Sequence, residues 1–200
     1  MKLSHKISSL EVLDIRYPTV RMGMAGSDPR HLAPNYSCAV TILHTDSGLE
    51  GRSLVFTAGD GTQIQKVAIE AFERFVVGRD LQDFIEEPGL FSQALLEHHQ
   101  LRWLALGVFR MAAGSVINAL WDLWAKSEGM PMWRLLTSLP PARIVQCIDF
   151  HHLRECTAQQ DGPVVRWMRY ASCVAVSTGR ALGLSRRRWA GVSNMTGFGR

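Results

Sequence analysis

Residues that could perform acid–base or metal chemistry are few and scattered in this sequence. His98-His99 beside Glu97, and His151-His152, are the histidine pairs that could bind a metal ion. Neighbouring helix positions point about 100° apart, so two adjacent rings do not easily share one ion. Solvated side chains explain both pairs more simply. Spacing alone therefore predicts no catalytic residue and no metal ligand.

A glycine turn is the next candidate. Gly59-Asp60-Gly61 precedes a helical pattern, and the first turn of a helix can hold an anion. No third glycine follows to complete a dinucleotide-binding fingerprint. We therefore expect an ordinary turn in which Asp60 or Thr62 caps the helix.

The positive charge of the chain belongs to its last quarter. The net charge is +4, but residues 1–150 carry 14 Lys+Arg and 16 Asp+Glu, whereas residues 151–200 carry 8 Arg and 2 acids. Arg186-Arg187-Arg188 could contact RNA or a membrane surface. No interleaved aromatic residues accompany this charge, so we expect neither a nucleic acid nor a membrane as partner.

The cysteines and the apolar segments bear on the compartment. Four separated cysteines, with no C-x-x-C pair, suit reduced thiols: Cys38, Cys147, Cys156 and Cys173. No run reaches the roughly 18 apolar residues of a membrane span, and residues 1–13 lack the apolar block of a secretory signal. We expect a cytoplasmic or mitochondrial protein that is not secreted.

The elements that must position any site begin with strands. Apolar and polar residues alternate imperfectly over 6–17, and two further strand patterns, 36–44 and 49–57, flank a turn at Ser47-Gly48. These patterns predict a three-stranded antiparallel sheet whose last two strands form a hairpin.

From residue 62 onward the period changes from two to 3.6. An apolar stripe that starts at Ile64 and ends at Val76 predicts one helix, and similar patterns predict helices over 89–99 and 106–127 and a helical turn over 132–139. A sheet followed by helices defines an α+β domain of about 140 residues. The apolar run 143–150 then predicts a strand buried on both faces, as in a parallel barrel. Too few residues follow it to complete a (β/α) barrel.

Six sequence blocks carry a resemblance to a known family. They follow one another in the order found in that family: Gly26-Ser27-Asp28, 34–39 (PNYSCA), 54–61 (LVFTAGDG), 100–104 (QLRWL), 113–126 (AGSVINALWDLWAK) and 147–150 (CIDF). The resemblance covers about residues 5–155. The sequence resembles the L-fuconate dehydratase branch of the enolase superfamily, within the mandelate racemase / muconate lactonizing enzyme group.

This resemblance implies an N-terminal capping domain that sits on a (β/α)7β barrel and closes over an acid sugar. In such enzymes Mg²⁺ stabilises the ene-diolate formed when the α-proton of the substrate is removed, and the β-hydroxyl then leaves as water. By resemblance, the substrate-binding residues of this chain are Gly26, Ser27, Asp28 and Tyr36. The family's Lys-x-Lys strand, metal carboxylates and barrel histidine have no counterpart here, because the only lysines are Lys2, Lys6, Lys66 and Lys126.

We therefore expect three parts: a capping domain over 1–140, a first barrel strand over 141–156 and a divergent, Arg-rich, poorly ordered or weakly helical tail over 157–200. The resemblance implies a truncated dehydratase that binds no Mg²⁺ itself and is inactive alone. It also implies an acid-sugar substrate, and either the missing barrel domain or a second copy as partner. The alternative is a non-enzymatic capping module that binds a homologous subunit or another protein.

Overall fold

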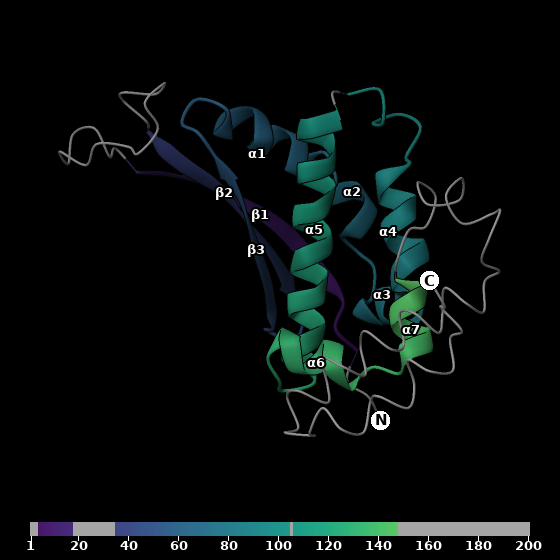
Figure 1. The fold of residues 1–200 in the computed structure, drawn as a ribbon. Coiled ribbons are helices and arrows are strands. Elements are labelled where there is room, and N and C mark those ends of the chain that lie inside the picture. The colour runs from purple at the N-terminus through teal and green to yellow at the C-terminus, as the bar shows by residue number, and fades with distance from the viewer. Residues whose placement is uncertain (1–3, 18–34, 105, 148–200) are drawn as a thin grey trace, which may run out of the picture. The chain divides into compact units, whose positions relative to one another are not determined.

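The computed structural model describes residues 4–17, 35–104 and 106–147, in two compact units, Met1–Leu135 and Leu136–Arg200 (Figure 1). The predicted tail, 157–200, lies outside the described residues, and the predicted domain limits stay predictions. No helix in the described ranges combines the length and the apolar character needed to cross a bilayer.

The first unit begins with the predicted antiparallel sheet. Strands β1 (Ile7–Tyr17), β2 (Tyr36–Thr45) and β3 (Glu50–Thr57) lie in the order β1-β2-β3. Gly48, with a φ of +83°, makes the turn between β2 and β3, a backbone conformation that glycine adopts without steric cost. The predicted sheet and hairpin are confirmed.

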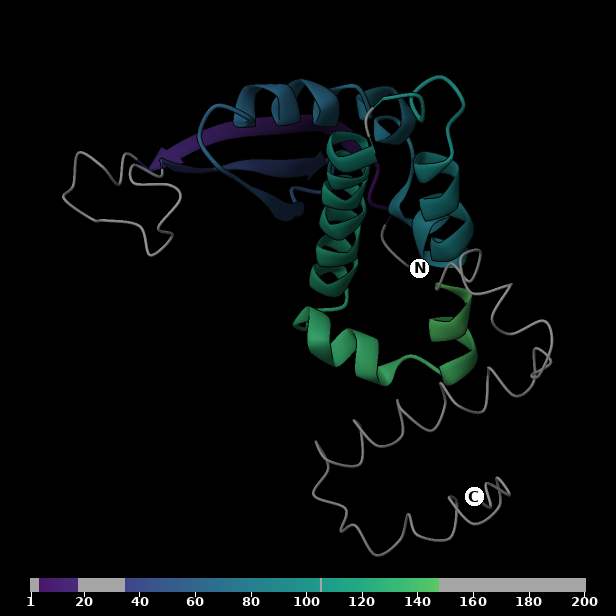
Figure 2. The same ribbon diagram turned by 45° about the horizontal axis from the view of Figure 1, so that its top comes forward.

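Helices follow the sheet in chain order, which confirms the α+β class. They are α1 (Thr62–Glu70), α2 (Glu73–Val76), α3 (Leu81–Glu86), α4 (Pro88–Leu96), α5 (Leu106–Ser127) and α6 (Met132–Ser138). Helices α1 and α5 pack on the sheet, and α2, α3 and α4 lie on the other side of α5 (Figures 1 and 2). The core gathers where α5 meets its neighbours, and its largest fully buried side chains include Phe72, Phe84, Phe109, Leu43, Leu120 and Leu123.

Helix α5 approaches β3 at a glycine. A Cβ on Gly51 would lie 2.2 Å from the carbonyl oxygen of Ala119 and 2.7 Å from the Cβ of Leu123. Only a residue without a side chain allows the strand and the helix backbone to come this close.

Both outer strands of the sheet have partners near the β2–β3 turn. On β3, the amide of Arg52 donates to Asp122 Oδ2 at 2.7 Å, and Lys126 Nζ donates to the carbonyl of Glu50 at 2.8 Å. Asp122 and Lys126 are themselves paired at 2.6 Å on α5. On β1, the amide of Ile7 donates to the carbonyl of Arg79 at 2.9 Å.

The first predicted helix differs from the prediction. It is divided into α1 and α2, and two residues of the predicted apolar stripe, Ile64 and Val67, are 62% and 66% exposed. The buried side of α1 instead carries Thr62, Gln65 and Ile69. Gln65 donates a long hydrogen bond, 3.4 Å, to the carbonyl of Val108 on α5, so the side of α1 that faces the core has a polar contact.

The strand predicted over 143–150 is wrong where the structure describes it. Helix α7 (Pro141–Gln146) occupies this position, and residues 148–150 lie outside the described residues. Pro140 is extended and Pro141 opens the helix, a position where the missing amide of proline costs nothing. The Cys147 thiol donates to the carbonyl of Arg143 at 3.1 Å, and burial raises the pKa of this thiol.

Candidate functional site

The candidate site lies at the end of the sheet where β1 ends at Tyr17 and β2 begins at Tyr36. Three of the four predicted substrate-binding residues, Gly26, Ser27 and Asp28, lie outside the described residues, so their role stays a prediction. Tyr36 is half-buried and lies opposite Tyr17 in the sheet register. Its ring packs against Phe56 of β3, with centroids 5.6 Å apart.

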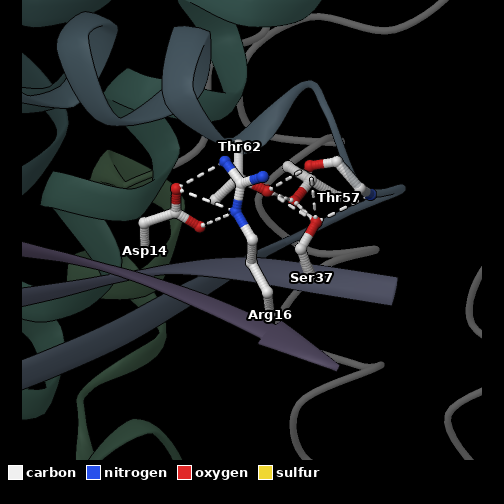
Figure 3. Close-up of polar contacts among 6 residues, drawn as sticks. Asp14, Arg16, Ser37, Thr57 and Thr62 are labelled. Carbon is white, nitrogen blue, oxygen red and sulfur yellow. Dashed lines mark hydrogen bonds and ion pairs between the residues drawn. The ribbon is translucent and has the colours of Figure 1, made fainter. Parts of the chain in front are cut away.

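A cluster of hydroxyls lies directly behind Tyr36. Ser37 and Thr62 are fully buried, and their oxygens are 2.5 Å apart. Thr57 Oγ1 lies 2.7 Å from Ser37 Oγ and 2.5 Å from Thr62 Oγ1 (Figure 3). The amide of Gly59 donates to Ser37 Oγ at 2.8 Å. We call Ser37, Thr57 and Thr62 with the backbone of Gly59 the hydroxyl cluster.

Strand register and one turn assemble this cluster. Ser37 on β2 is the direct partner of Thr57 on β3. The chain then turns at Gly59, whose φ of +76° favours glycine, and returns Thr62 to the same place as the first residue of α1. A Cβ on Gly59 would lie 3.2 Å from the carbonyl oxygen of Asn35, so this turn packs closely against the start of β2.

The prediction that Asp60 or Thr62 caps helix α1 is wrong. Gly61 holds the N-cap position of α1, and no side chain bonds to the free amides there. The hydroxyl of Thr62 donates to the carbonyl of Gly59 at 3.0 Å. Thr62 therefore fixes the turn that leads into the helix, and neither it nor Asp60 caps the helix.

An ion pair lies beside the cluster on the same face of the sheet. Arg16 is the register partner of Ser37, and its guanidinium donates to both carboxylate oxygens of Asp14 at 2.8 to 3.2 Å (Figure 3). These hydrogen bonds hold the pKa of Asp14 below its ordinary value, so this carboxylate stays charged near neutral pH. The pair is exposed, and solvent weakens its contribution to stability.

Tyr17 lies at the same end of the sheet, on the face opposite to the hydroxyl cluster. A hydrogen bond with the Cys38 side chain raises the pKa of Tyr17 above its ordinary value of 10.0. Cys38 is buried under this side of the sheet. The Tyr17 phenol therefore stays protonated near neutral pH.

These groups can bind and position, but they do not form an acid–base pair. The three hydroxyls of the cluster bond to one another and to Gly59, and no histidine or carboxylate within the described ranges is placed to take a proton from them. Among the residues that the structure describes, no group of three or more His, Cys, Asp or Glu side chains could hold a metal ion. The described residues therefore do not fit Mg²⁺, and no catalytic step is assigned to them through it.

His98 and His99 follow α4, away from the sheet end. Their rings stack on each other with centroids 5.2 Å apart, and the ring of His98 lies 4.4 Å from that of Phe75. The pair thus takes part in aromatic packing.

Sequence reasoning missed the hydroxyl cluster. Its members come from β2, β3 and α1, so no local spacing links them. A usable signal was the hydroxyl on each side of the glycine turn, Thr57 and Thr62. The third member, Ser37, becomes visible only once the strand register is known.

Comparison with known proteins gives a consistent result. Residues 29–137 match the N-terminal domain of the mandelate racemase / muconate lactonizing enzyme family. Human mitochondrial enolase superfamily member 1 is 39% identical over 160 residues, which cover 78% of this chain and 36% of the relative. L-Galactonate dehydratase of Hypocrea jecorina is 35% identical over 157 residues, which cover 78% of this chain and 35% of the relative.

The solved structures agree. The crystal structure of the human protein superposes with a TM-score of 0.72 at 38% identity, over 78% of this chain and 36% of that chain. A Bradyrhizobium enolase crystallised with magnesium and mandelic acid shares the fold alone, with a TM-score of 0.55 at 20% identity over 68% of this chain and 36% of that chain. The chain thus spans about a third of the length of the relatives it matches.

Proposed function

Because this chain belongs to the mandelate racemase / muconate lactonizing enzyme family through its N-terminal domain, we propose that it is the substrate-binding capping domain of an acid-sugar dehydratase. The observation that carries this proposal is the similarity to the fungal L-galactonate dehydratase, 35% identical over 157 residues. The α+β fold of the described residues matches the N-terminal capping domain of the enolase superfamily, which is consistent with this proposal.

We assign the substrate end of the domain to the end of the sheet beside Tyr36. Tyr36 is half-buried on Phe56, and the hydroxyl cluster behind it ties the start of β2 to the turn before α1. Interactions of this kind hold a binding residue in a fixed geometry. In this proposal Gly26, Ser27, Asp28 and Tyr36 contact the sugar hydroxyls and select the substrate, and L-fuconate is the substrate that the sequence blocks favour.

We propose that proton abstraction belongs to a barrel that these 200 residues do not supply. The four lysines of the sequence lie at or before residue 126, and the family's Lys-x-Lys motif has no counterpart among them. In the proposed enzyme the barrel would hold Mg²⁺, which would supply Lewis-acid chemistry, and the capping domain excludes water and orients the sugar. The polypeptide alone is then inactive, and its compartment is the mitochondrion or the cytoplasm.

A domain exchange tests the proposed role of the capping domain. Residues 5–140 replace the matching segment of the fungal L-galactonate dehydratase, and formation of the 2-keto acid product is measured with L-galactonate and with L-fuconate. We expect an active chimera whose kcat/KM ratio shifts toward L-fuconate. In the chimera, Tyr36→Phe should raise KM more than it lowers kcat, since a contact made equally in ground and transition states acts on KM.

The outcomes separate the parts of the proposal. A folded chimera whose preference for L-galactonate is unchanged contradicts the assignment of specificity to this domain. The unmodified 200-residue chain, assayed with Mg²⁺ and L-fuconate, should form no product above the uncatalysed background. Measurable turnover would contradict the proposed inactivity of the polypeptide alone.

A second candidate function is a non-enzymatic capping module that binds another subunit. Exposed apolar side chains on α1 and at the start of α5 favour it: Ile64 and Leu106 are 62% and 64% exposed. The same side chains suit a surface that rests on a barrel. An active chimera supports the capping domain of an enzyme. If every barrel joined to this domain is inactive, the non-enzymatic module is supported instead.

A further inference from the structure

Among the residues that the structure describes, helices pack on one face of the sheet and leave the other face uncovered. Thr41 and Ser53 point toward α5, since their hydroxyls lie 2.7 and 2.8 Å from Ser115 Oγ. Side chains alternate along a strand, so their neighbours in sequence point the opposite way. We call the residues that point away from α5 the open face: Glu11, Leu13, Ile15 and Tyr17 on β1; Tyr36, Cys38, Val40, Ile42 and His44 on β2; Glu50, Arg52, Leu54 and Phe56 on β3.

The end of the open face nearest Tyr36 is apolar and exposed. Leu54 and Phe56 on β3 are 63% and 60% exposed, and Tyr17 and Leu13 on β1 are 50% and 37% exposed. Between them the central strand presents Val40, which is half-buried. Contiguous exposed apolar side chains of this kind mark interaction sites.

The other end of the open face is charged, with both signs present. His44 lies 3.1 Å from Glu11 and 3.1 Å from Glu50, and Arg52 pairs with Glu50 at 2.5 Å. Glu11 on β1 and Arg52 on β3 therefore lie at the same level along the strands, on opposite sides of β2.

The register makes this face complementary to itself. Glu11 and Arg52 are both partners of Ile42, Leu13 and Leu54 are both partners of Val40, and Ile15 and Phe56 are both partners of Cys38. A two-fold axis along β2 would place β1 of one copy over β3 of the other, at the same level. Glu11 would then meet Arg52 of the second copy, and Leu13 and Ile15 would meet Leu54 and Phe56.

We propose that the open face, apart from its end at Tyr17 and Tyr36, binds a second copy of this chain, sheet against sheet, around such an axis. Aligned packing of two sheets, with strand directions within about 30°, is a common arrangement, and a two-fold interface uses the same patch on both copies. The charge complementarity of Glu11 and Arg52 favours a second copy over an unrelated apolar partner. The inference goes beyond the proposed function, because it concerns the open face and needs no catalysis.

Sedimentation velocity on the full 200-residue chain, of 22.4 kDa, tests the proposal. We expect a reversible dimer. Leu54→Asp should raise the dimer dissociation constant at least about tenfold, because it places a charge in the apolar half of the interface. The matched control is Leu90→Asp on α4, which is also 63% exposed but lies off the open face and should leave the constant unchanged. Far-UV circular dichroism verifies that both variants keep the fold.

Charge reversal tests the predicted orientation. Glu11→Arg and Arg52→Glu should each weaken the dimer, because each places like charges together across the interface. The double variant should restore the dissociation constant to within about threefold of the original, since it exchanges the two charges. A monomeric chain, a dimer insensitive to Leu54→Asp, or a double variant no tighter than either single variant overturns the proposal.

Discussion

Replacing Gly51 by alanine should destabilise the domain more than any other single methyl group added to a described glycine. The new Cβ would lie 2.2 Å from the carbonyl oxygen of Ala119 and 2.7 Å from the Cβ of Leu123. Both obstacles belong to the rigid helix α5, so no side-chain rotation relieves the overlap. The helix must move away from β3, and this movement loosens the packing of the core side chains between α5 and the sheet.

The expected cost follows from the rigidity of the contact. Adding a methylene group to a packed core costs about 1–3 kcal/mol, and a backbone obstacle places this change at the upper end, about 3 kcal/mol. A small domain has a total free energy of unfolding of about 5–15 kcal/mol, so the loss is a large fraction of it. Equilibrium unfolding in urea measures the loss, with the fluorescence of Trp121 and Trp124 as the signal, since their stacked rings lie in α5.

Gly61→Ala is the matched control. Gly61 has a φ of −71°, and nothing lies within 4 Å of the position that the methyl group of an alanine would take, so alanine fits there. This change should be neutral or stabilise the domain by up to about 1 kcal/mol, because alanine reduces the entropy of the unfolded chain. A loss below about 1 kcal/mol for Gly51→Ala, or equal losses for the two variants, would refute the close contact between α5 and β3.

Three further predictions concern single polar groups. Ser37→Ala should lower the free energy of unfolding by about 1–3 kcal/mol in urea titrations, because the buried amide of Gly59 loses its acceptor, whereas the more exposed Ser92→Ala should cost less. Asp80 accepts a hydrogen bond from the amide of Gln82 at 2.8 Å, and hydrogen bonds from Ser4 and this amide lower the pKa of Asp80. The charged carboxylate therefore stabilises the fold above the ordinary pKa of 3.8, and this contribution is lost as the pH falls through the folded pKa. Unfolding of Asp80→Asn should therefore depend less on pH in acid, and an unchanged acid profile would contradict the assigned bonds. The hydrogen bond with Cys38 raises the pKa of Tyr17, so this contact stabilises the fold below pH 10.0 and ceases to do so as the pH rises through the folded pKa. Ultraviolet titration of Cys38→Ala should therefore show this phenol ionising at a lower pH than in the unmodified chain.

Periodic patterns predicted most of the fold. The three strands and α5 begin and end within one residue of where alternation and the 3.6-residue period place them. The prediction of a stripe through Ile64 and Val67 was wrong because the side of α1 that packs inward carries Thr62, Gln65 and Ile69, two of them polar, which an apolar period does not identify. The strand predicted over 143–150 failed because a proline can begin a helix as readily as it ends a strand pattern.

The candidate site was harder to predict than the fold. Tyr36 was identified by the resemblance of a sequence block, and the structure describes its place at the start of β2. The hydroxyl cluster depends on strand register and on one turn, neither of which a linear pattern contains. Polar sites formed by three elements therefore need coordinates, whereas apolar periods can be read along the chain.

The hydrogen bonds at the two outer strands limit how this sheet can grow. An unpaired edge strand is a template on which another chain can add a strand and start an aggregate. Here the Asp122–Lys126 pair occupies an amide and a carbonyl of β3, and the backbone of Arg79 occupies an amide of β1. An incoming strand would have to displace these groups before it could pair, so fibril-like extension is hindered near the β2–β3 turn. Removing the carboxylate of Asp122 would free the amide of Arg52 for amyloid-type pairing, although Lys126 would still occupy the carbonyl of Glu50.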